Sequence, residues 1–332
     1  MKNTFFCIDA HTCGNPVRLV AGGAPMLPHL PIGERRALFM EQYDWIRRAL
    51  MFEPRGHDVM SGAILYPAWR EDCDVAVLFI EVSGCLPMCG AGTIGLVTTA
   101  LQEGLLTPRT PGVVSLETPA GRVDVRYTRE GDKVTSVQMI NVASYLHASD
   151  VVVEVPGVGE LVVDVAYGGN FYAVVEPQAN WSGLDGARAS TIIDLSQRLR
   201  AALADVIDPV HPLDAGIRGV HHVLWCDGAD ASVADGRSAV FYGEQAIDRS
   251  PGGTGTSARL AQLHGKGRLA VGQNYRAQSL IGTVFTGRVE SETDIGDYQG
   301  IIPSVTGWAK VIGYNTLIVD DEDPLAHGFQ IS

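Results

Sequence analysis

The sequence lacks long apolar runs and has no cysteine pair of the CxxC type. Its longest uninterrupted apolar stretch, Val75 to Ile80, has the length of a buried strand, whereas a membrane-spanning helix needs about 20 residues. Asp9 interrupts the short apolar run at the N-terminus, so an export signal is not expected. The six cysteines therefore indicate reduced thiols in a cytoplasmic protein, rather than a disulfide framework or a zinc site.

Basic residues are also scarce, with 25 Lys and Arg against 38 Asp and Glu, and they form no local run. The resulting net charge of −13 repels phosphate backbones and anionic lipid, which argues against nucleic acid and membrane partners. What is present is a chain of 332 residues, 46% hydrophobic, which is enough for about two domains of 150 residues each. The composition is typical of an α/β or α+β globular protein.

Residue periodicity predicts more strands than helices, and a domain boundary near residues 145–150. A long amphipathic helix is expected over residues 33–52, and its apolar face should cover a sheet. Further helices are expected at 93–103, 188–206 and 255–265, and strands at 74–81, 113–117, 122–127 and 134–140. Residues 151–165 are expected to form a hairpin that Pro156 and Gly157 close, after the polar stretch at 144–150.

An internal repeat is the most informative feature of the chain. A shift of 163 residues places Cys89 to Thr93 over Gly252 to Thr256, and it also aligns Glu81 with Glu244. In each copy an apolar strand precedes a glycine loop, and a helix follows the loop. The two halves therefore resemble copies of one unit, and two such units are expected to meet across a cleft that both loops face.

A glycine loop that opens a helix exposes backbone N–H groups at the positive end of the helix dipole, where anions bind. Two such loops could hold a small carboxylate. Cys89 directly precedes the first of these helices, a position that lowers the pKa of a thiol. We therefore expect Cys89 to be a base or a nucleophile.

Several other features have a simpler explanation. Residues 90–95 match GxGxxG, and Glu117 follows at the distance expected of a dinucleotide site, but eight residues separate the preceding strand from the first glycine. Neighbouring His221 and His222 point to opposite faces of a strand, so metal binding is not expected and one of them should lie near the cleft. Asp9 and His11 fit a structural role at least as well as a place in the cleft. The cysteines other than Cys89 that lie in apolar segments are interpreted as buried hydrophobic residues: Cys7, Cys73, Cys85 and Cys226.

Two segments resemble the active-site motifs of the proline racemase family. Residues 83–95 (SGCLPMCGAGTIG) are similar to the first motif, and residues 248–258 (DRSPGGTGTSA) to the second. Residues 8–16, 53–58 and 166–171 resemble the 4-hydroxyproline 2-epimerase branch of that family in particular. The resemblance covers nearly the whole chain.

This resemblance implies an α+β fold of two pseudo-symmetric lobes of the diaminopimelate-epimerase type, each a barrel-like unit around a central helix, with no cofactor and no metal. The first lobe is expected to comprise residues 1–148 and 313–332, and the second residues 149–312. Family members use one cysteine in each loop, on opposite faces of the substrate α-carbon. The implied roles are catalytic base for Cys89, and substrate binding for Gly90, Ala91, Asp248, Gly253 and Thr254, with Asp248 near the ring nitrogen. His222 and Gly252 are also expected to lie at the substrate site.

The chain departs from the family pattern at two positions. Gly252 stands where the second cysteine is usual, and Ala91 stands where the first loop usually has histidine. A two-base inversion needs an acid on the far face, which glycine cannot supply. Three hypotheses follow: a 4-hydroxyproline 2-epimerase or a variant of it, a one-base lyase resembling trans-3-hydroxyproline dehydratase, or a non-catalytic imino-acid binder. In each, the partner is a small imino acid, and the protein is a monomer or a homodimer.

Overall fold

Two segments that are distant in the sequence form one unit of the structure, and the segment between them forms a second. The structure is a computed structural model that describes residues 2–331. Unit 1 comprises Met1–Met139 and Gly307–Ser332, and unit 2 comprises Ile140–Thr306. Strands outnumber helices in both units, as the sequence predicts, and the fold class is α+β. Among residues 2–331, the structure has no helix with the length and apolar character that crossing a membrane requires.

The elements of unit 1 are strands β1 (Lys2–Thr12), β2 (Asn15–Gly22), β3 (Ser61–Tyr66), β4 (Val75–Glu81), β5 (Gly84–Leu86), β6 (Val113–Thr118), β7 (Gly121–Glu130), β8 (Lys133–Ile140) and β20 (Ala309–Asp320), with helices α1 (Ile32–Gln42), α2 (Asp44–Met51) and α3 (Gly90–Gln102). The elements of unit 2 are strands β9 (Ser144–Val155), β10 (Gly159–Tyr167), β11 (Phe171–Val175), β12 (Val210–His211), β13 (Asp214–Arg218), β14 (His222–Asp227), β15 (Gly236–Tyr242), β16 (Ala246–Ile247), β17 (Asn274–Gln278), β18 (Val284–Ile295) and β19 (Tyr298–Gly307), with helices α4 (Ala189–Ala204) and α5 (Gly253–Gly265).

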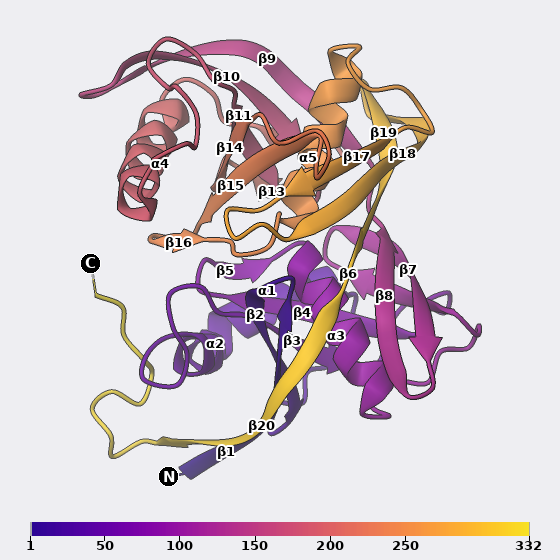
Figure 1. The fold of residues 1–332 in the computed structure, drawn as a ribbon. Helices are drawn as coiled ribbons and strands as arrows, with labels where there is room; N and C mark the ends of the chain where they lie inside the picture. Colours follow the sequence, from indigo (N-terminus) through magenta and orange to yellow (C-terminus); the bar gives the residue numbers. More distant parts are fainter. Residues whose placement is uncertain (1, 332) are drawn as a thin grey trace. The chain divides into compact units, whose positions relative to one another are not determined.

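Helix α3 is the centre of unit 1. Its sequence is apolar or small on every side, and each residue from Gly90 to Leu101 is buried. A helix without a polar face must be enclosed, and α3 contacts β1, β2, β3 and β20. Strand β20, from the end of the chain, lies beside β1 along its full length (Figure 1). The first glycine loop is thereby held at the end of a helix that strands surround.

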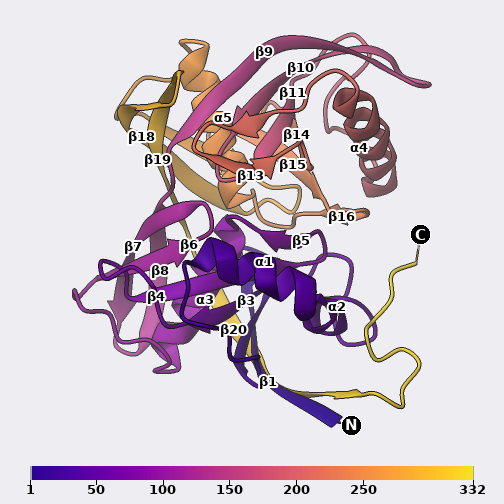
Figure 2. The ribbon, with the colours of Figure 1, turned by 180° about the vertical axis from the view of Figure 1, so that it is seen from behind.

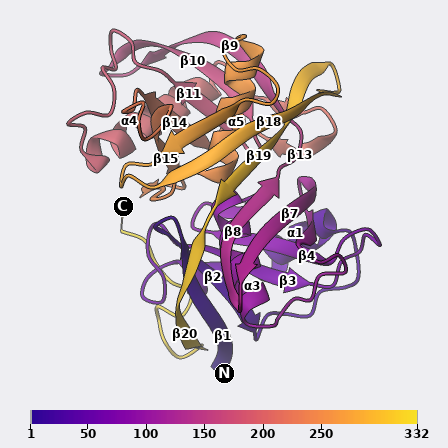
Figure 3. The same ribbon diagram turned by 45° about the vertical axis from the view of Figure 1, so that its right-hand side comes forward.

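Helix α5 has the same place in unit 2. Its residues from Gly253 to Leu263 are buried, and it contacts β9, β10, β11 and β18. Figure 3 shows β18 passing alongside α5. Helix α4 lies on the side of β11 and β14 that faces away from α5 (Figures 1 and 2). The second glycine loop is therefore also positioned by a helix inside a strand layer.

The two units have the same order of strands, helix and parallel pairs, which confirms the predicted repeat. Strand β2 pairs in parallel with β3, and β11 pairs in parallel with β14. Strand β4 pairs in parallel with β6, and β15 with β17. A shift of 163 residues moves the bounds of α3 onto those of α5. Each copy therefore builds a helix of the same length from the same position in the repeat.

The last strand of each copy belongs to the other unit, and this corrects the expected division of the chain. Strand β9 follows the first copy but pairs with β10 of unit 2, and β20 follows the second copy but pairs with β1 of unit 1. The boundaries expected after residues 148 and 312 fall inside these two strands. The polar residues at 144–150 indicated a linker because β9 is only half-buried there, yet Tyr145 is already paired with Tyr167.

The single helix expected over residues 33–52 is also corrected, since the structure has α1 and α2 instead. Tyr43 leaves the helical region with φ −130° and ψ 10°, and Asp44 starts the second helix. Asp44 forms an ion pair with Arg47 at 2.6 Å. Asp44 lies at the N-terminus of α2, where the helix dipole favours a negative charge. The break lets α1 bury Phe39 while α2 buries Leu50.

Candidate active site

The N-terminus of α3 carries Cys89 as its capping residue, where the sequence placed it. Cys89 has an extended backbone, and its Sγ accepts a hydrogen bond from the N–H of Gly92 at 3.3 Å. The carbonyl of Cys89 accepts from the N–H of Thr93 at 2.9 Å, which begins the helix. The thiol is 7% exposed. A donated N–H and the positive end of the helix dipole both stabilise negative charge on this sulfur.

Glycines of the first loop allow close approaches that a side chain would prevent. A Cβ on Gly92 would lie 3.0 Å from the Cys89 Sγ, so only glycine lets this N–H reach the sulfur without displacing it. A Cβ on Gly95 would lie 2.9 Å from the Oγ1 of Thr12, which donates to the carbonyl of Ala91 at 2.8 Å. The GxGxxG pattern is thus explained by the packing of α3 and by the position of the thiol.

Glu117, the acidic residue that a dinucleotide site would require, binds main-chain N–H groups instead. The Glu117 carboxylate is buried and accepts hydrogen bonds from the N–H groups of Ile32 at 3.1 Å and Trp69 at 2.6 Å. It also accepts from the N–H of Arg70 at 3.1 Å, so it holds the start of α1 and the 69–70 loop. Strand β4, which precedes the loop, is antiparallel to β3 and β5 and parallel to β6, so it lies in a mixed sheet, whereas a dinucleotide fold has a mostly parallel one.

A buried carboxylate lies beside the thiol. Oε1 of Glu81 is 3.6 Å from the Sγ of Cys89, within hydrogen-bond distance for sulfur. Ser61 donates to Oε1 at 2.9 Å, and Ser83 donates to Oε2 at 2.5 Å. Burial raises the pKa of Glu81, against the lowering effect of these three hydrogen bonds. Sequence reasoning missed this residue, although the repeat had already marked its position.

The N-terminus of α5 has no thiol and no side-chain cap. Gly252 precedes this helix, and its N–H donates to the Oγ of Ser250 at 3.2 Å. Ser250 in turn donates to Oδ1 of Asp248 through its N–H at 2.7 Å and its hydroxyl at 2.8 Å. Asp248 is 9% exposed, so this carboxylate is held by the turn that leads into the helix. Gly253 and Thr254 lie in the first turn of α5. As at every helix start, no carbonyl within the helix accepts a hydrogen bond from their N–H groups.

Gly252 has a conformation that suits glycine alone. Its φ of 77° lies in the region that side chains disfavour, and an added Cβ would lie 2.8 Å from a methyl group of Val240. A side chain at this position would therefore require a change of the backbone or of Val240.

His222 and Thr254 are connected through one tyrosine. The hydroxyl groups of Tyr172 and Thr254 are 2.7 Å apart, and the ring of His222 lies 4.9 Å from the ring of Tyr172. Burial, followed by the neighbouring His221 and Arg200, lowers the pKa of His222 to about 3, so the ring is neutral at pH 7. His221 is exposed whereas His222 is buried. This agrees with the prediction that the two neighbouring side chains point to opposite faces. Nδ1 of His222 has no hydrogen-bond partner among the described residues.

The turn between β10 and β11 packs directly on α5. A Cβ on Gly168 would lie 2.3 Å from the carbonyl oxygen of Thr254 and 2.4 Å from the N of Ala258. The side-chain amide of Asn141 donates to the carbonyl of Gly168 at 2.8 Å and to the hydroxyl of Ser257 at 2.9 Å. These contacts explain the glycine of the 166–171 motif.

Other residues that the sequence singled out have structural roles. Both carboxylate oxygens of Asp9 accept from Arg18 at 2.8 Å, and Nδ1 of His11 accepts from the N–H of Gly14 at 3.1 Å. The cysteines interpreted as hydrophobic are buried, which confirms the prediction, and burial raises the pKa of Cys7 and Cys85 to about 12. No group of three or more His, Cys, Asp or Glu that could hold a metal ion occurs within residues 2–331.

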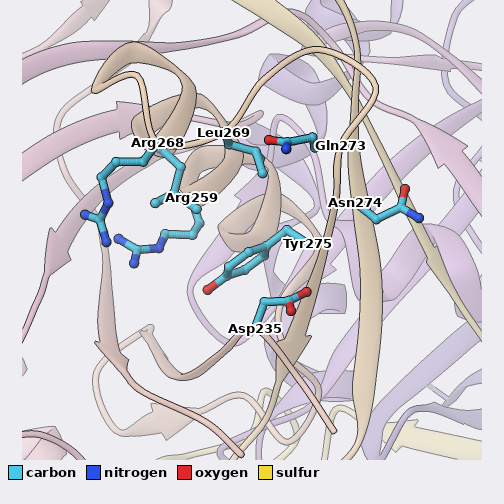
Figure 4. A pocket seen from close by; sticks show the side chains of 8 residues that line it. Asp235, Arg259, Arg268, Leu269, Gln273, Asn274 and Tyr275 are labelled. Atoms are coloured by element: carbon cyan, nitrogen blue, oxygen red, sulfur yellow. The ribbon is translucent and has the colours of Figure 1, made fainter. Parts of the chain in front are cut away.

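Unit 2 also contains a cavity of about 520 Å³ near the middle and end of α5 (Figure 4). Its charged side chains already have partners, because Arg259 pairs with Glu176 at 2.7 Å and Asp235 pairs with Arg276 at 2.9 Å. The cavity lining includes neither Cys89 nor the residues 248–254. The candidate site residues of unit 1 therefore lie at the N-terminus of α3, beside the thiol of Cys89, and those of unit 2 lie at the N-terminus of α5.

Comparison with known proteins agrees with the sequence motifs. A family model described as proline racemase matches residues 7–330. The protein named 4-hydroxyproline 2-epimerase 2 from Rhizobium rhizogenes is 67% identical over 331 residues, which cover 100% of both chains. A 4-hydroxyproline 2-epimerase from Ancylobacter novellus is 55% identical over 330 residues, 99% of each chain.

Two crystal structures have similar folds with TM-scores of 0.91. One is a hydroxyproline epimerase from Agrobacterium vitis with bound trans-4-hydroxy-L-proline, 30% identical, and the match covers 99% of this chain and 96% of that one. The other is a probable proline racemase from Agrobacterium radiobacter with bound carbonate, 31% identical, and the match covers 98% of this chain and 96% of that one.

Proposed function

The chain belongs to the proline racemase family, and from this premise we propose that it is an isomerase that acts at the α-carbon of 4-hydroxyproline without a cofactor. The observation that carries the proposal is the full-length identity of 67% to a 4-hydroxyproline 2-epimerase, together with a thiol at the start of a buried helix. Its activity is that of an epimerase, or of a variant in which inversion is weakened by the glycine at position 252.

Removal of an α-proton from an imino acid requires a base and stabilisation of the charge that develops toward the carboxylate. Cys89 is the proposed base, because the N–H of Gly92 and the helix dipole favour its thiolate. Since the N–H of Gly92 is used by the sulfur, the N–H groups of Gly90 and Ala91 are the ones proposed to bind the substrate carboxylate.

The second loop supplies the remaining contacts in this proposal. The N–H groups of Gly253 and Thr254 bind the other side of the carboxylate, and Asp248 binds the ring nitrogen. The Asp248 carboxylate suits this role because the N–H and the hydroxyl of Ser250 both donate to Oδ1 and orient the group. His222 contributes a neutral ring to the substrate site, beside Tyr172.

Inversion requires a proton donor on the face opposite Cys89. Gly252 has none, so a water molecule is the proposed donor there. The replacement of the usual histidine by Ala91 enlarges the space around the substrate. Proton exchange on the Cys89 face should therefore be faster than inversion.

The direct test is to incubate the protein with trans-4-hydroxy-L-proline and to measure formation of the C2 epimer by chiral chromatography. Cys89→Ala should lower the rate by about 10³-fold, within the range for a general base. Cys85→Ala removes a buried thiol four residues away and is the matched control, for which the rate should be nearly unchanged. Equal activity of Cys89→Ala and the wild-type protein would refute the proposal.

The single thiol supports a second candidate, a one-base lyase that acts on trans-3-hydroxyproline. Cys89 would take the α-proton, the β-hydroxyl would leave with a proton as water, and a cyclic imine would form. Incubation with trans-3-hydroxyproline and detection of the imine distinguishes this reaction from epimerisation. Calorimetric binding of pyrrole-2-carboxylate without turnover of either substrate would instead favour a non-catalytic imino-acid binder.

A further inference from the structure

Glu81 is a buried acid that the proposed function does not use. It ends β4 with 5% of its surface exposed, and three side chains donate hydrogen bonds to its carboxylate. Ser61 and Ser83 donate to it at 2.9 and 2.5 Å, and the Cys89 Sγ is 3.6 Å from Oε1. Of these three donors, the thiol is the most acidic, so it is the group that exchanges a proton with the carboxylate most readily.

The cations near Glu81 are occupied elsewhere. From α2, the Arg47 guanidinium donates to the main-chain carbonyl of Glu81 at 2.8 Å and forms an ion pair with Asp44 at 2.6 Å. From α1, Arg36 donates to the carbonyl of Cys85 on β5 at 2.6 Å. Strand β3 contributes only the neutral Ser61. Burial of the carboxylate raises the pKa of Glu81, and this effect exceeds the lowering by the hydrogen bonds and by the charge of Arg47.

The corresponding position in unit 2 has the opposite character. Glu244, which the repeat aligns with Glu81, is exposed and forms an ion pair with Arg200 at 3.0 Å. Position 252, which the repeat aligns with Cys89, has no thiol. At these two aligned positions, unit 1 thus has a buried acid and a thiol, whereas unit 2 has an exposed acid and a glycine.

We propose that Glu81 is a positioning residue that shares one proton with Cys89 and holds this proton when the thiol acts as a base. In this step a proton moves from Sγ to Oε1, which leaves a thiolate and a neutral carboxylic acid without changing the total charge. The thiolate then takes the α-proton of the substrate and becomes a thiol again, while Glu81 keeps its proton until the α-proton is returned. The inference rests on the proposed function, because it gives Cys89 the role of base.

The test measures the Cys89 thiolate without any substrate. The absorbance at 240 nm is recorded between pH 5 and 10, and the spectrum of the Cys89→Ala protein is subtracted in each background. Glu81→Gln keeps the shape of the side chain and removes the base. We expect the thiolate fraction at pH 7 to fall by about tenfold in Glu81→Gln, which corresponds to one pKa unit.

Ser83→Ala is the matched control, because it removes a hydrogen bond to the same carboxylate and leaves the carboxylate in place. Its thiolate fraction should equal or exceed that of the wild-type protein. An unchanged or larger thiolate fraction in Glu81→Gln, or an equal loss in Ser83→Ala, would overturn the proposal. Because the readout needs no turnover, a protein without epimerase activity that passes this test would contradict the proposed function and leave the proton pair intact.

A second measurement covers the case in which Glu81→Gln does not fold. Carbon-13 NMR of the wild-type protein, with the Glu81 carboxyl and the Cys89 Cβ labelled, follows both groups through one pH titration. We expect the two resonances to shift in a common step, as interacting sites do. A carboxyl resonance that stays at its ionised position while the thiolate forms would also overturn the proposal.

Discussion

The N-termini of α3 and α5 occupy the same position in a repeat but differ in chemistry. Cys89 caps α3 with an extended backbone and a sulfur that accepts an N–H, whereas Gly252 precedes α5 with φ 77° and no side-chain cap. Both retain a glycine-rich first turn with N–H groups that can bind an anion. The comparison shows that both copies keep a glycine-rich helix start, whereas a thiol caps the helix in unit 1 and glycine precedes it in unit 2.

The same comparison shows two solutions to one packing problem. In unit 1, Thr12 lies against the helix and donates to the carbonyl of Ala91, and the helix has Gly95 at the contact. In unit 2, Gly168 lies against the carbonyl of Thr254, and the helix has Ala258 at the contact. The small residue is on the helix in one copy and on the preceding turn in the other. Close packing of helix and turn is thus maintained although the residues differ.

The largest effect on stability is expected when a side chain is added at the start of α5. Gly252→Ala should lower the free energy of unfolding by about 2 to 5 kcal/mol, because strain at positive φ and an overpacked contact with Val240 add together. Urea denaturation measures this change. Gly104→Ala is the matched control, since Gly104 has φ 69° and no atom within 4 Å of an added Cβ.

The difference between these two variants isolates the contact from the strain. Val240→Ala should reduce the cost of Gly252→Ala when both changes are in one chain. Equal costs for Gly252→Ala and Gly104→Ala would show that the contact is unimportant. The result also bears on whether Gly252→Cys with Ala91→His can restore two-base chemistry. If Gly252→Ala greatly lowers the free energy of unfolding, the double variant should gain inversion only when Val240 is also replaced by a shorter residue.

A smaller effect is expected at the contact between α3 and β1. Gly95→Ala should lower the free energy of unfolding by about 1 to 3 kcal/mol, because its Cβ would lie 2.9 Å from Thr12 and 3.0 Å from Val17. Adding Thr12→Gly creates the arrangement found in unit 2. A double-mutant cycle should then show favourable coupling between the two changes. Strict additivity would contradict the equivalence of the two contacts.

The last effect concerns pH, and it distinguishes the two adjacent histidines. Burial holds the pKa of His222 at about 3, below the usual histidine value of 6.5, so between these pH values the unfolded chain binds a proton that the folded protein does not. Stability should therefore fall as the pH decreases from 6.5 toward 3, by up to about 1.4 kcal/mol per pH unit from this one group.

Urea denaturation at several pH values tests this expectation. His222→Phe keeps a ring beside Tyr172 and should flatten the dependence, whereas the exposed His221→Ala should leave it unchanged. A wild-type slope in His222→Phe would mean that another group causes the loss of stability in acid.

The sequence predicted those features of the candidate site that depend on residues close to one another in the sequence. The position of Cys89 at a helix start follows from the glycines after it and the apolar strand before it, and the repeat placed Gly252 at the equivalent position. The bounds of α3 and α5 were predicted to within three residues because a glycine loop precedes each helix and a glycine, Gly104 or Gly267, follows it. The family motifs then suggested the chemistry.

The features that the sequence did not predict depend on tertiary contacts. Glu81 is eight residues from Cys89 and meets it because β4 and β5 form a hairpin, while Ser61 reaches the same carboxylate from β3. The positive φ of Gly252 is a property of its turn, which the residue type permits but does not require. The exchange of β9 and β20 between units was missed because strand partners distant in the sequence leave no local pattern.

The central claim is that one thiol, at the start of α3, performs the proton transfer. The most direct measurement is the ratio of α-deuterium incorporation to inversion in D2O, for trans-4-hydroxy-L-proline and for its C2 epimer, at low conversion. The account predicts incorporation with retention that exceeds inversion for the stereoisomer whose α-proton faces Cys89, and the loss of both in Cys89→Ala. Equal rates of inversion and exchange from both stereoisomers would show that a second acid acts on the far face, and would contradict the account.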